Sequence, residues 1–482
     1  MLTKFSVIMN LKGFAVITFV LLTLRANTQE QLGLKISNYS GVNALQLNPA
    51  WTMGGPLRWD VNIVSLGAFI EQDYVYGRRG TVPRLLNNGG ELITDETAVS
   101  TDGTTTNSAV PFYFTERRNF DAHHNAFVMA PSFMANIGDH TFGLYWQGRT
   151  WLSGYNIDGD LAYANVSDTV VFIGNIDPFQ VAAMTWGEIG LNYGRNIRSD
   201  RNLKINAGGT LKFLLGFDAV NISNYSTTGV NRANDAVTVD PANVGISYAT
   251  NYSAENGYDL QRNGFGLSTD LGITFINPNA KQSKQEYRWK VGVSLLDVGR
   301  IWYRKNANDY TFTSEEISTF NDDPFADITD MDGVIEAINA SGNVSSAELV
   351  DDKFGMWSPM ALSLQFDAPL IDRLYLSGTA VIGMRFKSAA IERSDLIAIT
   401  PRFEMKWFEI GMPVSLYRWN DVRMGTYLRM GPLTVGTENL NSWAIPGKLE
   451  GSDFYLALKI NSSMFKKCQN KGRGEGCYSN DF

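Results

Sequence analysis

Few residues in this chain have the types and spacing that enzymatic or metal chemistry needs. The chain has 3 histidines, His123, His124 and His140. A nucleophilic serine would need a histidine base and an orienting acid, and no motif singles out such a serine. His123 and His124 are interpreted as a surface or interface pair. The sequence therefore predicts no catalytic residue, no metal site, no cofactor and no enzymatic activity.

The 2 cysteines, Cys468 and Cys477, lie near the C-terminus with eight residues between them. In an oxidising compartment this spacing favours a small disulfide loop, and two free thiols in a polar tail are the alternative. Structural zinc needs four ligands, and Glu475 is the only carboxylate between these cysteines. The pair is therefore not interpreted as a metal site.

An acidic segment covers residues 311–352, with 11 carboxylates and no basic residue. A calcium loop here would need an oxygen ligand in place of Ile328 and a glutamate in place of Asn339. A solvated outer loop is the better interpretation of such a charge run. Asp332 and Gly333, followed by apolar residues up to Ile338, predict a short helix within it.

The other charged residues alternate with apolar ones along extended segments. In Leu203–Phe217 the odd positions are mostly apolar, whereas Lys204 and Lys212 occupy even positions. This period of two is typical of a β-strand. A strand of about 15 residues is longer than the usual 5 to 6 of soluble sheets, and about 9 to 11 suffice to cross a bilayer. The segment therefore predicts a membrane-spanning strand.

The same alternation recurs at 57–69, 186–195, 264–276, 402–407 and 454–461. In a soluble sandwich the apolar sides would form the core, whereas in a barrel they face lipid and the polar sides face a lumen. The predicted lumen-facing polar residues are Arg58, Asp60, Glu188, Lys204, Lys212, Asp270, Lys290, Arg385, Arg402, Glu404, Lys406, Glu409 and Lys459. Their mixed signs fit ion pairs that hold the structure together, with a substrate path as the alternative.

The N-terminus favours the barrel. Lys4 and Lys12 precede the apolar run 13–24, which is too short for a transmembrane helix and is typical of a signal peptide over residues 1–28. Met9 is an alternative to Met1 as the first residue of the translated chain. Removal of this segment leaves 38 basic residues against 49 acidic ones, a net charge of −11. Bulk charge of this sign excludes nucleic acid as a partner.

These features together predict an all-β protein, a closed antiparallel transmembrane β-barrel over residues 57–465 in the bacterial outer membrane. Aromatic residues make up 12% of the chain and glycines number 45, as interface girdles and curved strands require. The segment 77–111 is predicted to be a surface loop, and 466–482 a periplasmic tail. Sixteen segments qualify as strands, including 237–252 and 301–313. An even number of 14 or 16 strands is expected.

Two short motifs before the first strand resemble the N-terminal hatch of FadL-type outer-membrane barrels. They are Gly41-Val42-Asn43 and Leu47-Asn48-Pro49-Ala50. The segment Ser294 to Gly299 also supports the resemblance. The chain is more similar to an uncharacterised FadL-like barrel family of bacteria with type IX secretion. The resemblance implies 14 strands and a lumenal plug over residues 29–56, with Asn48, Pro49 and Ala50 as its hatch motif. An ordinary turn is the alternative interpretation of these three residues.

Two functions remain open from the sequence. FadL-like binding or transport of a small apolar molecule follows from the resemblance. A scaffold or shuttle barrel for secreted or surface proteins is suggested by the long polar loop 77–111, the acidic segment 311–352 and the tail. The expected partners are the lipid bilayer and either an apolar small molecule or other outer-membrane or secreted proteins. A simple diffusion porin is disfavoured by the predicted plug.

Overall fold

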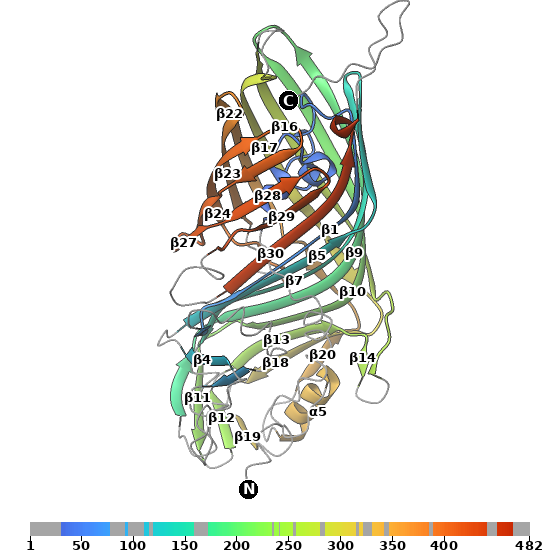
Figure 1. The fold of residues 1–482 in the computed structure, drawn as a ribbon. Coiled ribbons are helices and arrows are strands. Elements are labelled where there is room, and N and C mark those ends of the chain that lie inside the picture. The colour runs from blue at the N-terminus through green and yellow to red at the C-terminus, as the bar shows by residue number, and fades with distance from the viewer. Residues whose placement is uncertain are drawn as a thin grey trace, which may run out of the picture.

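The computed structural model is a closed antiparallel β-barrel with 14 barrel strands among the residues that the structure describes (Figure 1). Closure is made by β1 (Trp59–Gln72), which pairs with β30 (Gly451–Asn461) on one side and with β5 (Asn119–Met129) and β6 (Ser132–Ile137) on the other. The described residues are 30–77, 92–94, 110–114, 119–158, 172–233, 236–240, 242–253, 257–279, 285–314, 318–321, 330–341, 347–384, 389–440 and 451–465.

A barrel strand is one crossing of the wall, made by a single strand or by two in line. The further single crossings are β7 (His140–Asp158), β9 (Phe179–Ser199), β10 (Lys204–Asn224), β16 (Gly264–Pro278), β17 (Tyr287–Tyr303), β23 (Leu374–Gly383), β24 (Leu396–Glu404) and β29 (Leu433–Thr437). The crossings made in two parts are β5 with β6, β21 (Phe354–Trp357) with β22 (Ala361–Ile371), β25 (Phe408–Gly411) with β26 (Val414–Tyr417), and β27 (Asp421–Met424) with β28 (Thr426–Met430). Pro131, Pro359 and Pro413 lie in three of these four breaks, since proline cannot donate to the ladder.

Short turns join the barrel strands at one end, which we call the turn rim (138–139, 200–203, 372–373, 405–407 and 431–432). Longer connections, 159–178, 225–263 and 304–353 among them, emerge at the opposite end, the loop rim. β1 begins and β30 ends at the turn rim. In bacterial barrels the short turns are periplasmic and the long loops extracellular, so the turn rim corresponds to the periplasmic side.

The prediction of a membrane-spanning strand at Leu203–Phe217 is confirmed by β10, which is longer than expected. Leu211 is 45% exposed on the outside, whereas its neighbour Lys212 is 2% exposed inside the lumen. The period of two thus separates a lipid side from a lumen side, as the alternation indicated.

Two of the sixteen predicted strands, 237–252 and 301–313, are not crossings of the barrel. β13 (Ala242–Ala249) pairs with the outer end of β10 from Ala219 to Asn224, while β16 pairs with the rest of β10. β18 (Ala307–Ser314) pairs with β13 and not with the barrel. These strands extend the sheet beyond the loop rim. Of the sixteen predicted strands, 14 are therefore crossings of the barrel wall. Alternation cannot distinguish a bilayer strand from a solvated one, because both have one apolar side.

Smaller elements lie at the loop rim. β20 (Glu348–Asp351) pairs with β18, and α5 (Met331–Ser341) confirms the predicted helix in the acidic segment. A second sheet consists of β8 (Phe172–Ile176), β11 (Thr228–Ala233), β12 (Ala236–Asp240) and β19 (Ser318–Asn321). A third contains β2 (Val75–Gly77), β3 (Leu92–Thr94) and β4 (Val110–Phe114), and β14 (Tyr252–Ser253) pairs with β15 (Gly257–Tyr258). At the opposite end, the turn rim, a 3₁₀ turn, η4 (Ser462–Met464), follows β30.

Residues 30–56 form a plug inside the barrel, drawn in blue in Figure 1. The plug contains α2 (Leu32–Lys35) and the 3₁₀ helix η1 (Gly41–Gln46). Leu34, Val42 and Leu45 pack against one part of the wall with Tyr145, Tyr427 and Tyr455. Leu32, Ile36 and Leu47 pack against another, with Phe69 and Tyr417. The plug is therefore packed against the wall on two sides.

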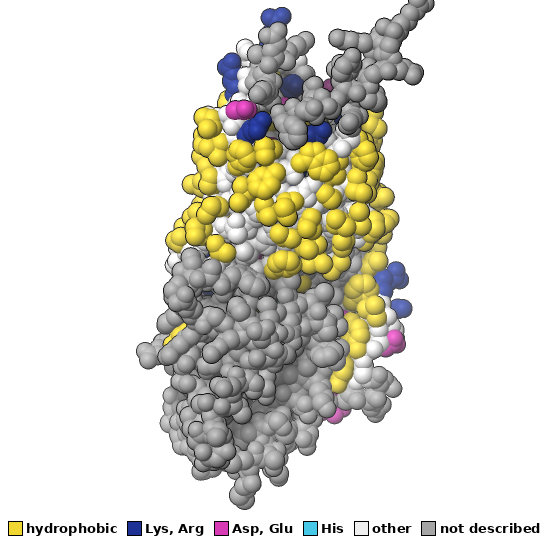
Figure 2. Space-filling view, viewed as in Figure 1, with side chains coloured by type: hydrophobic (Ala, Val, Ile, Leu, Met, Phe, Trp, Pro, Cys, Tyr) yellow, Lys and Arg dark blue, Asp and Glu magenta, His cyan; other side chains and the backbone are white. Residues whose placement is uncertain are grey.

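The outer surface of the barrel carries a band of exposed apolar side chains. Figure 2 shows these side chains over the upper part of the face in view, with most of the visible lysine and arginine above the band and a few at its lower right. Phe133, Trp146, Leu191, Leu267 and Ile399 are each at least 42% exposed. Exposed apolar residues at alternate positions of adjacent strands form a lipid-facing surface. No helix among the described residues is long and apolar enough to cross a membrane.

Replacing Leu211 with lysine is expected to destabilise the barrel by about 2–4 kcal/mol, because a charge near the bilayer midplane is costly. The measurement is the urea midpoint of unfolding in lipid vesicles. Leu349→Lys on β20 is the matched control, since Leu349 is 55% exposed but lies in the sheet beyond the loop rim. Equal midpoints for the two variants would contradict a lipid environment around β10.

The predicted signal peptide 1–28 and the tail 466–482 with Cys468 and Cys477 lie outside the described residues, as do Arg385 and most of the loop 77–111.

Candidate functional site

The lumenal side of β10 meets three environments in order from the turn rim. Thr210 accepts a hydrogen bond from Asn192, which lies beside the plug, at 2.9 Å. Lys212 lies between Asp270 and Asp297, and Leu214 is buried among apolar side chains. The lumen is thus layered into a plug, a charged layer and an apolar layer.

Asn48 attaches the plug to the wall. Its Nδ2 lies 3.3 Å from the carbonyl oxygens of Ile273 and Val293, and it donates to Gln365 Oε1 at 2.9 Å. Its Oδ1 accepts from the backbone N–H of Ala50 at 2.9 Å, which is the turn that the Asn-Pro-Ala motif predicts. The Asn48 side chain therefore both attaches the plug to the wall and stabilises the turn of the Asn-Pro-Ala motif.

Close approach of Asn48 to the wall requires a glycine. A Cβ added at Gly272 would lie 2.2 Å from Asn48 Oδ1, a contact that side chains do not tolerate. Gly41, at the start of η1, has φ +56°, and a Cβ there would lie 2.1 Å from the Asp60 carboxylate. Asp60 instead accepts from the Val42 N–H at 3.0 Å. Both ends of the 41–48 segment are thus fitted to the wall.

Two buried lysines donate to backbone carbonyls of the plug. Lys459 Nζ lies 2.9 Å from the Tyr39 oxygen and 2.7 Å from the Ser40 oxygen. Lys290 donates to the Trp51 carbonyl and lies 3.9 Å from the centre of the Trp51 ring. The plug has little secondary structure of its own, so its buried backbone carbonyls need hydrogen-bond donors from elsewhere, and these two lysines supply them.

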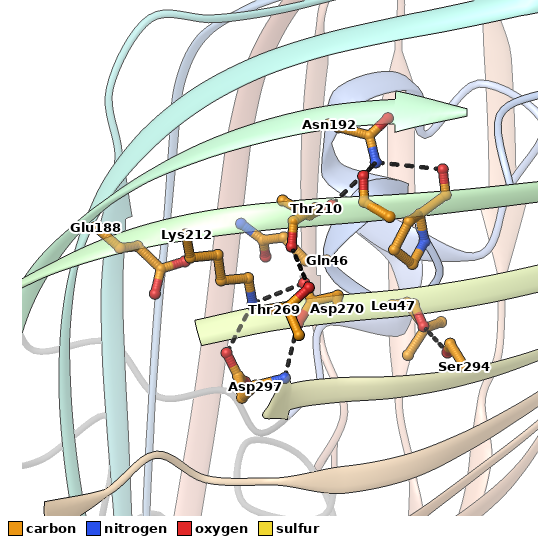
Figure 3. Close-up of polar contacts among 12 residues, drawn as sticks. Gln46, Leu47, Glu188, Asn192, Thr210, Lys212, Thr269, Asp270, Ser294 and Asp297 are labelled. Atoms are coloured by element: carbon orange, nitrogen blue, oxygen red, sulfur yellow. Dashed lines mark hydrogen bonds and ion pairs between the residues drawn. The ribbon is translucent and has the colours of Figure 1, made fainter. Parts of the chain in front are cut away.

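The charged layer is centred on Asp297 (Figure 3). Its Oδ1 lies 2.7 Å from Lys212 Nζ and 2.9 Å from Arg149 Nη1, and its Oδ2 lies 3.5 Å from Arg393 Nη1. Lys212 also lies 2.7 Å from Asp270, and Arg149 lies 3.2 Å from Glu188. We call this set, with Glu30 and Lys35 of the plug, the Asp297 cluster. It contains equal numbers of cations and carboxylates, so the burial of its charges is compensated by pairing.

A β-bulge directs Asp297 into the lumen. The register between β16 and β17 shifts between Thr269 and Leu271, which pair with Val298 and Leu295. Asp297 lies in this shift with φ 54°, and its N–H donates to Asp270 Oδ1 at 2.7 Å. Bulges re-aim a side chain in this way, and aspartate tolerates the left-handed conformation better than most residues.

The plug joins the Asp297 cluster through Glu30. Both carboxylate oxygens of Glu30 accept from Arg393 at 2.7 Å, and Lys35 lies 3.8 Å away. Arg393 belongs to the connection between β23 and β24, which folds inward at the loop rim. One network therefore joins the plug, the wall and an inward connection.

A second charged group lies nearer the turn rim. Arg402 donates to both oxygens of Asp367, at 2.7 and 2.9 Å, and to Glu404 at 2.9 Å. Glu404 accepts from the side chain of Asn38 in the plug at 2.8 Å. Arg429 and Glu409 pair at 3.0 Å in the same region.

The apolar layer towards the loop rim is a cluster of buried side chains that we call the apolar cluster. Its members are Trp151, Ala182, Met184, Trp186, Leu214, Ala219, Ala249, Ile301, Tyr303, Ala307, Phe354, Met356 and Ile391. Ile391 belongs to the inward connection and donates its N–H to the Trp357 oxygen at 3.1 Å. Arg149 stacks over the Trp186 ring at 4.8 Å, so the charged and apolar layers are in contact.

The predicted lumen-facing residues divide into two groups. Asp60, Glu188, Lys212, Asp270, Lys290, Arg402, Glu404, Glu409 and Lys459 are buried and take part in the contacts above. Arg58 and Lys406 are exposed and Lys204 is half-buried, all three near the turn rim and outside the two charged groups. Strand alternation predicts the side of a residue, but not how deep along the barrel it lies.

Several residues of the charged layers were not predicted, namely Glu30, Arg149, Asp297, Asp367 and Arg393. Arg149 shares the lumenal side of β7 with Tyr145 and Gln147, so alternation along 141–155 could have identified it. Asp297 breaks the alternation because it lies in a bulge. Arg393 lies in a connection, where no period exists to reveal its direction.

The interpretation of His123 and His124 as a surface pair is wrong for His123. His123 is 4% exposed, and its ring centre lies 4.8 Å from that of Tyr155. The two neighbours point to opposite sides because they lie in the strand β5. His140 is exposed, with Nδ1 2.9 Å from the Tyr193 hydroxyl. Within the described ranges no group of three or more metal-ligating side chains occurs.

Comparison with known families gives one match. The model of DUF5723, a family of unknown function, matches residues 87–438. The chain belongs to the DUF5723 family. None of the curated proteins matches this DUF5723 chain.

Solved structures similar to this DUF5723 chain include three outer-membrane transport proteins or their homologues. The Pseudomonas putida toluene transporter TodX is 8% identical, with 91% of this chain and 98% of that chain covered and a TM-score of 0.27. A Pseudomonas aeruginosa FadL homologue is 10% identical, with 87% and 94% covered and a TM-score of 0.22. The Ralstonia pickettii toluene transporter TbuX is 8% identical, with 87% and 94% covered and a TM-score of 0.22. All three scores are below 0.5, so the function proposed below rests on the residues of this chain.

Proposed function

We propose that this DUF5723 protein is an outer-membrane barrel that binds and passes small apolar molecules, with the plug as its gate. The observation that carries the proposal is the apolar cluster. A water-filled barrel has a polar lumen, and a lumen closed only by a structural plug does not require an apolar layer above it. An apolar layer next to the loop rim suits a molecule that enters from the outer side.

The charged layers constrain this proposal. The space around the plug is lined by paired charges, so an apolar molecule would not bind there. Passage beyond the apolar cluster would therefore require the Asp297 cluster to open and the plug to move. In this proposal the inward connection, which contributes Ile391 to the apolar cluster and Arg393 to the Asp297 cluster, couples the two events.

Leu214→Gln is the test of the apolar cluster. Leu214 is 1% exposed inside the lumen, and a buried amide without partners costs about 1–3 kcal/mol. We expect binding of a fluorescent apolar probe to the purified protein to weaken about tenfold. Leu211→Gln, three residues away on the lipid side of the same strand, is the matched control. Equal probe binding by wild type and both variants would count against the proposal.

The alternative function is a scaffold or shuttle barrel for secreted or surface proteins. The observation that favours it is the folded material beyond the loop rim, which comprises β13, β18 and β20, helix α5 and the sheet of β8, β11, β12 and β19. In this alternative the barrel would work with a type IX secretion machinery. Cross-linking in native outer membranes, followed by deletion of 311–352, tests it. Loss of a specific cross-linked protein on deletion supports the scaffold, and an unchanged pattern opposes it.

The remaining domain assignments stay proposals. We infer that residues 1–28 are removed as a signal peptide. N-terminal sequencing of the mature protein tests this inference, and Gln29 is the expected first residue. We infer that Cys468 and Cys477 form a disulfide in a periplasmic tail. Thiol labelling before and after reduction tests it, and two labelled thiols without reduction would oppose it.

A further inference from the structure

A cavity lies between the plug and the wall at the level of the Asp297 cluster. Its volume is about 30 Å³, on a measure by which one water molecule needs about 10–15 Å³, so it has room for one small polar group. The plug contributes Gln31, Lys35 and Gln46 to the lining, and Arg393 comes from the inward connection. The remaining lining residues lie on the wall. The cavity is therefore bounded by three parts of the chain that are distant in sequence.

The charges that line this cavity are mostly positive. Lys35, Arg149, Lys212 and Arg393 all line it, whereas Asp297 is the only carboxylate among the described residues of the lining. The carboxylates that balance the cluster, Glu30, Glu188 and Asp270, are not among the lining residues. A molecule in the cavity would therefore meet cations directly.

Lys35 is the least satisfied of these cations. It is 6% exposed, and its nearest carboxylate oxygen, on Glu30, lies 3.8 Å away, too far for a hydrogen bond. Both oxygens of Glu30 are already hydrogen-bonded to Arg393. Within the described part of the chain the Lys35 ammonium has no hydrogen-bond acceptor. Burial, opposed in part by the charge of Glu30, lowers the pKa of Lys35 to about 8.

We propose that this cavity binds an oxyanion, a carboxylate or phosphate group, with Lys35 as its principal ligand and Arg149 and Arg393 beside it. The amide groups of Gln31 and Gln46 also line the cavity, and amides donate to oxyanions. A charged acceptor would supply the hydrogen bond that Lys35 lacks.

The bound oxyanion would join the plug, β7 and the inward connection. It binds only when these three are together, so it stabilises the plugged state by mass action. This role goes beyond the proposed passage of apolar molecules and does not depend on it, because it concerns a polar group at the plug.

The test is titration of the full-length protein, in a non-ionic detergent and Tris chloride buffer, with inorganic phosphate and separately with octanoate. We expect saturable binding by calorimetry and a raised unfolding temperature. Saturation by phosphate indicates a free oxyanion, and saturation by octanoate alone indicates the head group of an amphiphile. Saturation by neither ligand would overturn the proposal.

Lys35→Gln removes the principal charge at similar side-chain length. We expect it to weaken binding about tenfold or more, as the loss of one charge-assisted hydrogen bond does. Lys353→Gln is the matched control, because the Lys353 side chain is 58% exposed and lies beyond the loop rim. Equal affinities for wild type and Lys35→Gln would overturn the assignment.

A measurement on the wild-type protein covers the case in which the Lys35 variant fails to fold. Hydrogen exchange with and without the saturating ligand should show added protection at residues 31–36 and 389–395. Protection confined to other parts of the chain would overturn the proposal.

Discussion

Asp297→Asn is expected to destabilise the barrel by about 3–5 kcal/mol, the cost of removing one partner from a buried ion pair. Lys212 and Arg149 would keep their charges at 3% and 8% side-chain exposure with one carboxylate fewer. Asparagine tolerates the left-handed backbone at this position, so the substitution removes the charge and leaves the bulge. The measurement is the urea midpoint of unfolding in lipid vesicles.

Asp200→Asn is the control for this loss. Asp200, in the turn between β9 and β10, also forms an ion pair, with Arg198 near the end of β9 at 2.5 Å, but both side chains are more than half exposed. Exposed pairs contribute at most about 1 kcal/mol. If both variants unfold at the same urea concentration, the Asp297 cluster does not hold the lumen together.

Asn48→Ala is expected to release the plug while the barrel stays folded. The substitution removes the donor to Gln365 and the acceptor for the Ala50 N–H, two buried hydrogen bonds. Each such loss costs about 1–3 kcal/mol where a partner is left unsatisfied. The population of undocked plug should rise on the order of 10²-fold. Asn48 Nδ2 also lies 3.3 Å from the Ile273 and Val293 carbonyl oxygens, but the backbone pairing of the strands does not depend on it, so the wall persists.

Single-channel recording in planar bilayers measures this release as longer or more frequent openings. Asn202→Ala, at an exposed position in a turn of the turn rim, is the matched control and should conduct like wild type. Heat-modifiable mobility on gels verifies that each barrel is folded. An Asn48→Ala protein as closed as wild type would contradict this role of Asn48 and leave retention of the plug to its other contacts, such as the packing of Leu34, Val42 and Leu45.

Strand alternation was the strongest source of prediction in this chain. It assigned Leu211 to the outside and Lys212 to the inside, because successive side chains of a strand point to opposite sides. The same rule assigned Asp60, Arg402 and Lys459 to a lumen that the structure shows to be filled. It overcounted the strands, because 237–252 and 301–313 alternate equally well in a sheet outside the bilayer.

The resemblance of Leu47-Asn48-Pro49-Ala50 to a hatch motif predicted a plug that composition alone did not require. In the structure residues 30–56 lie in the lumen and are attached to the wall, by Asn48 to Gln365 and by Lys459 to the Ser40 carbonyl. These partners are separated by 317 and 419 residues along the chain. Such pairs have no local signature in the sequence.

The sequence by itself determined that this chain forms a barrel wall with a lipid side and a lumen side, because that division depends only on residue type and a period of two. Only the tertiary structure decided which charges meet. The Asp297 cluster joins five barrel strands, an inward connection and the plug, and its central residue lies in a bulge that breaks the period. The direction of Asp297 therefore depends on the pairing of β16 with β17.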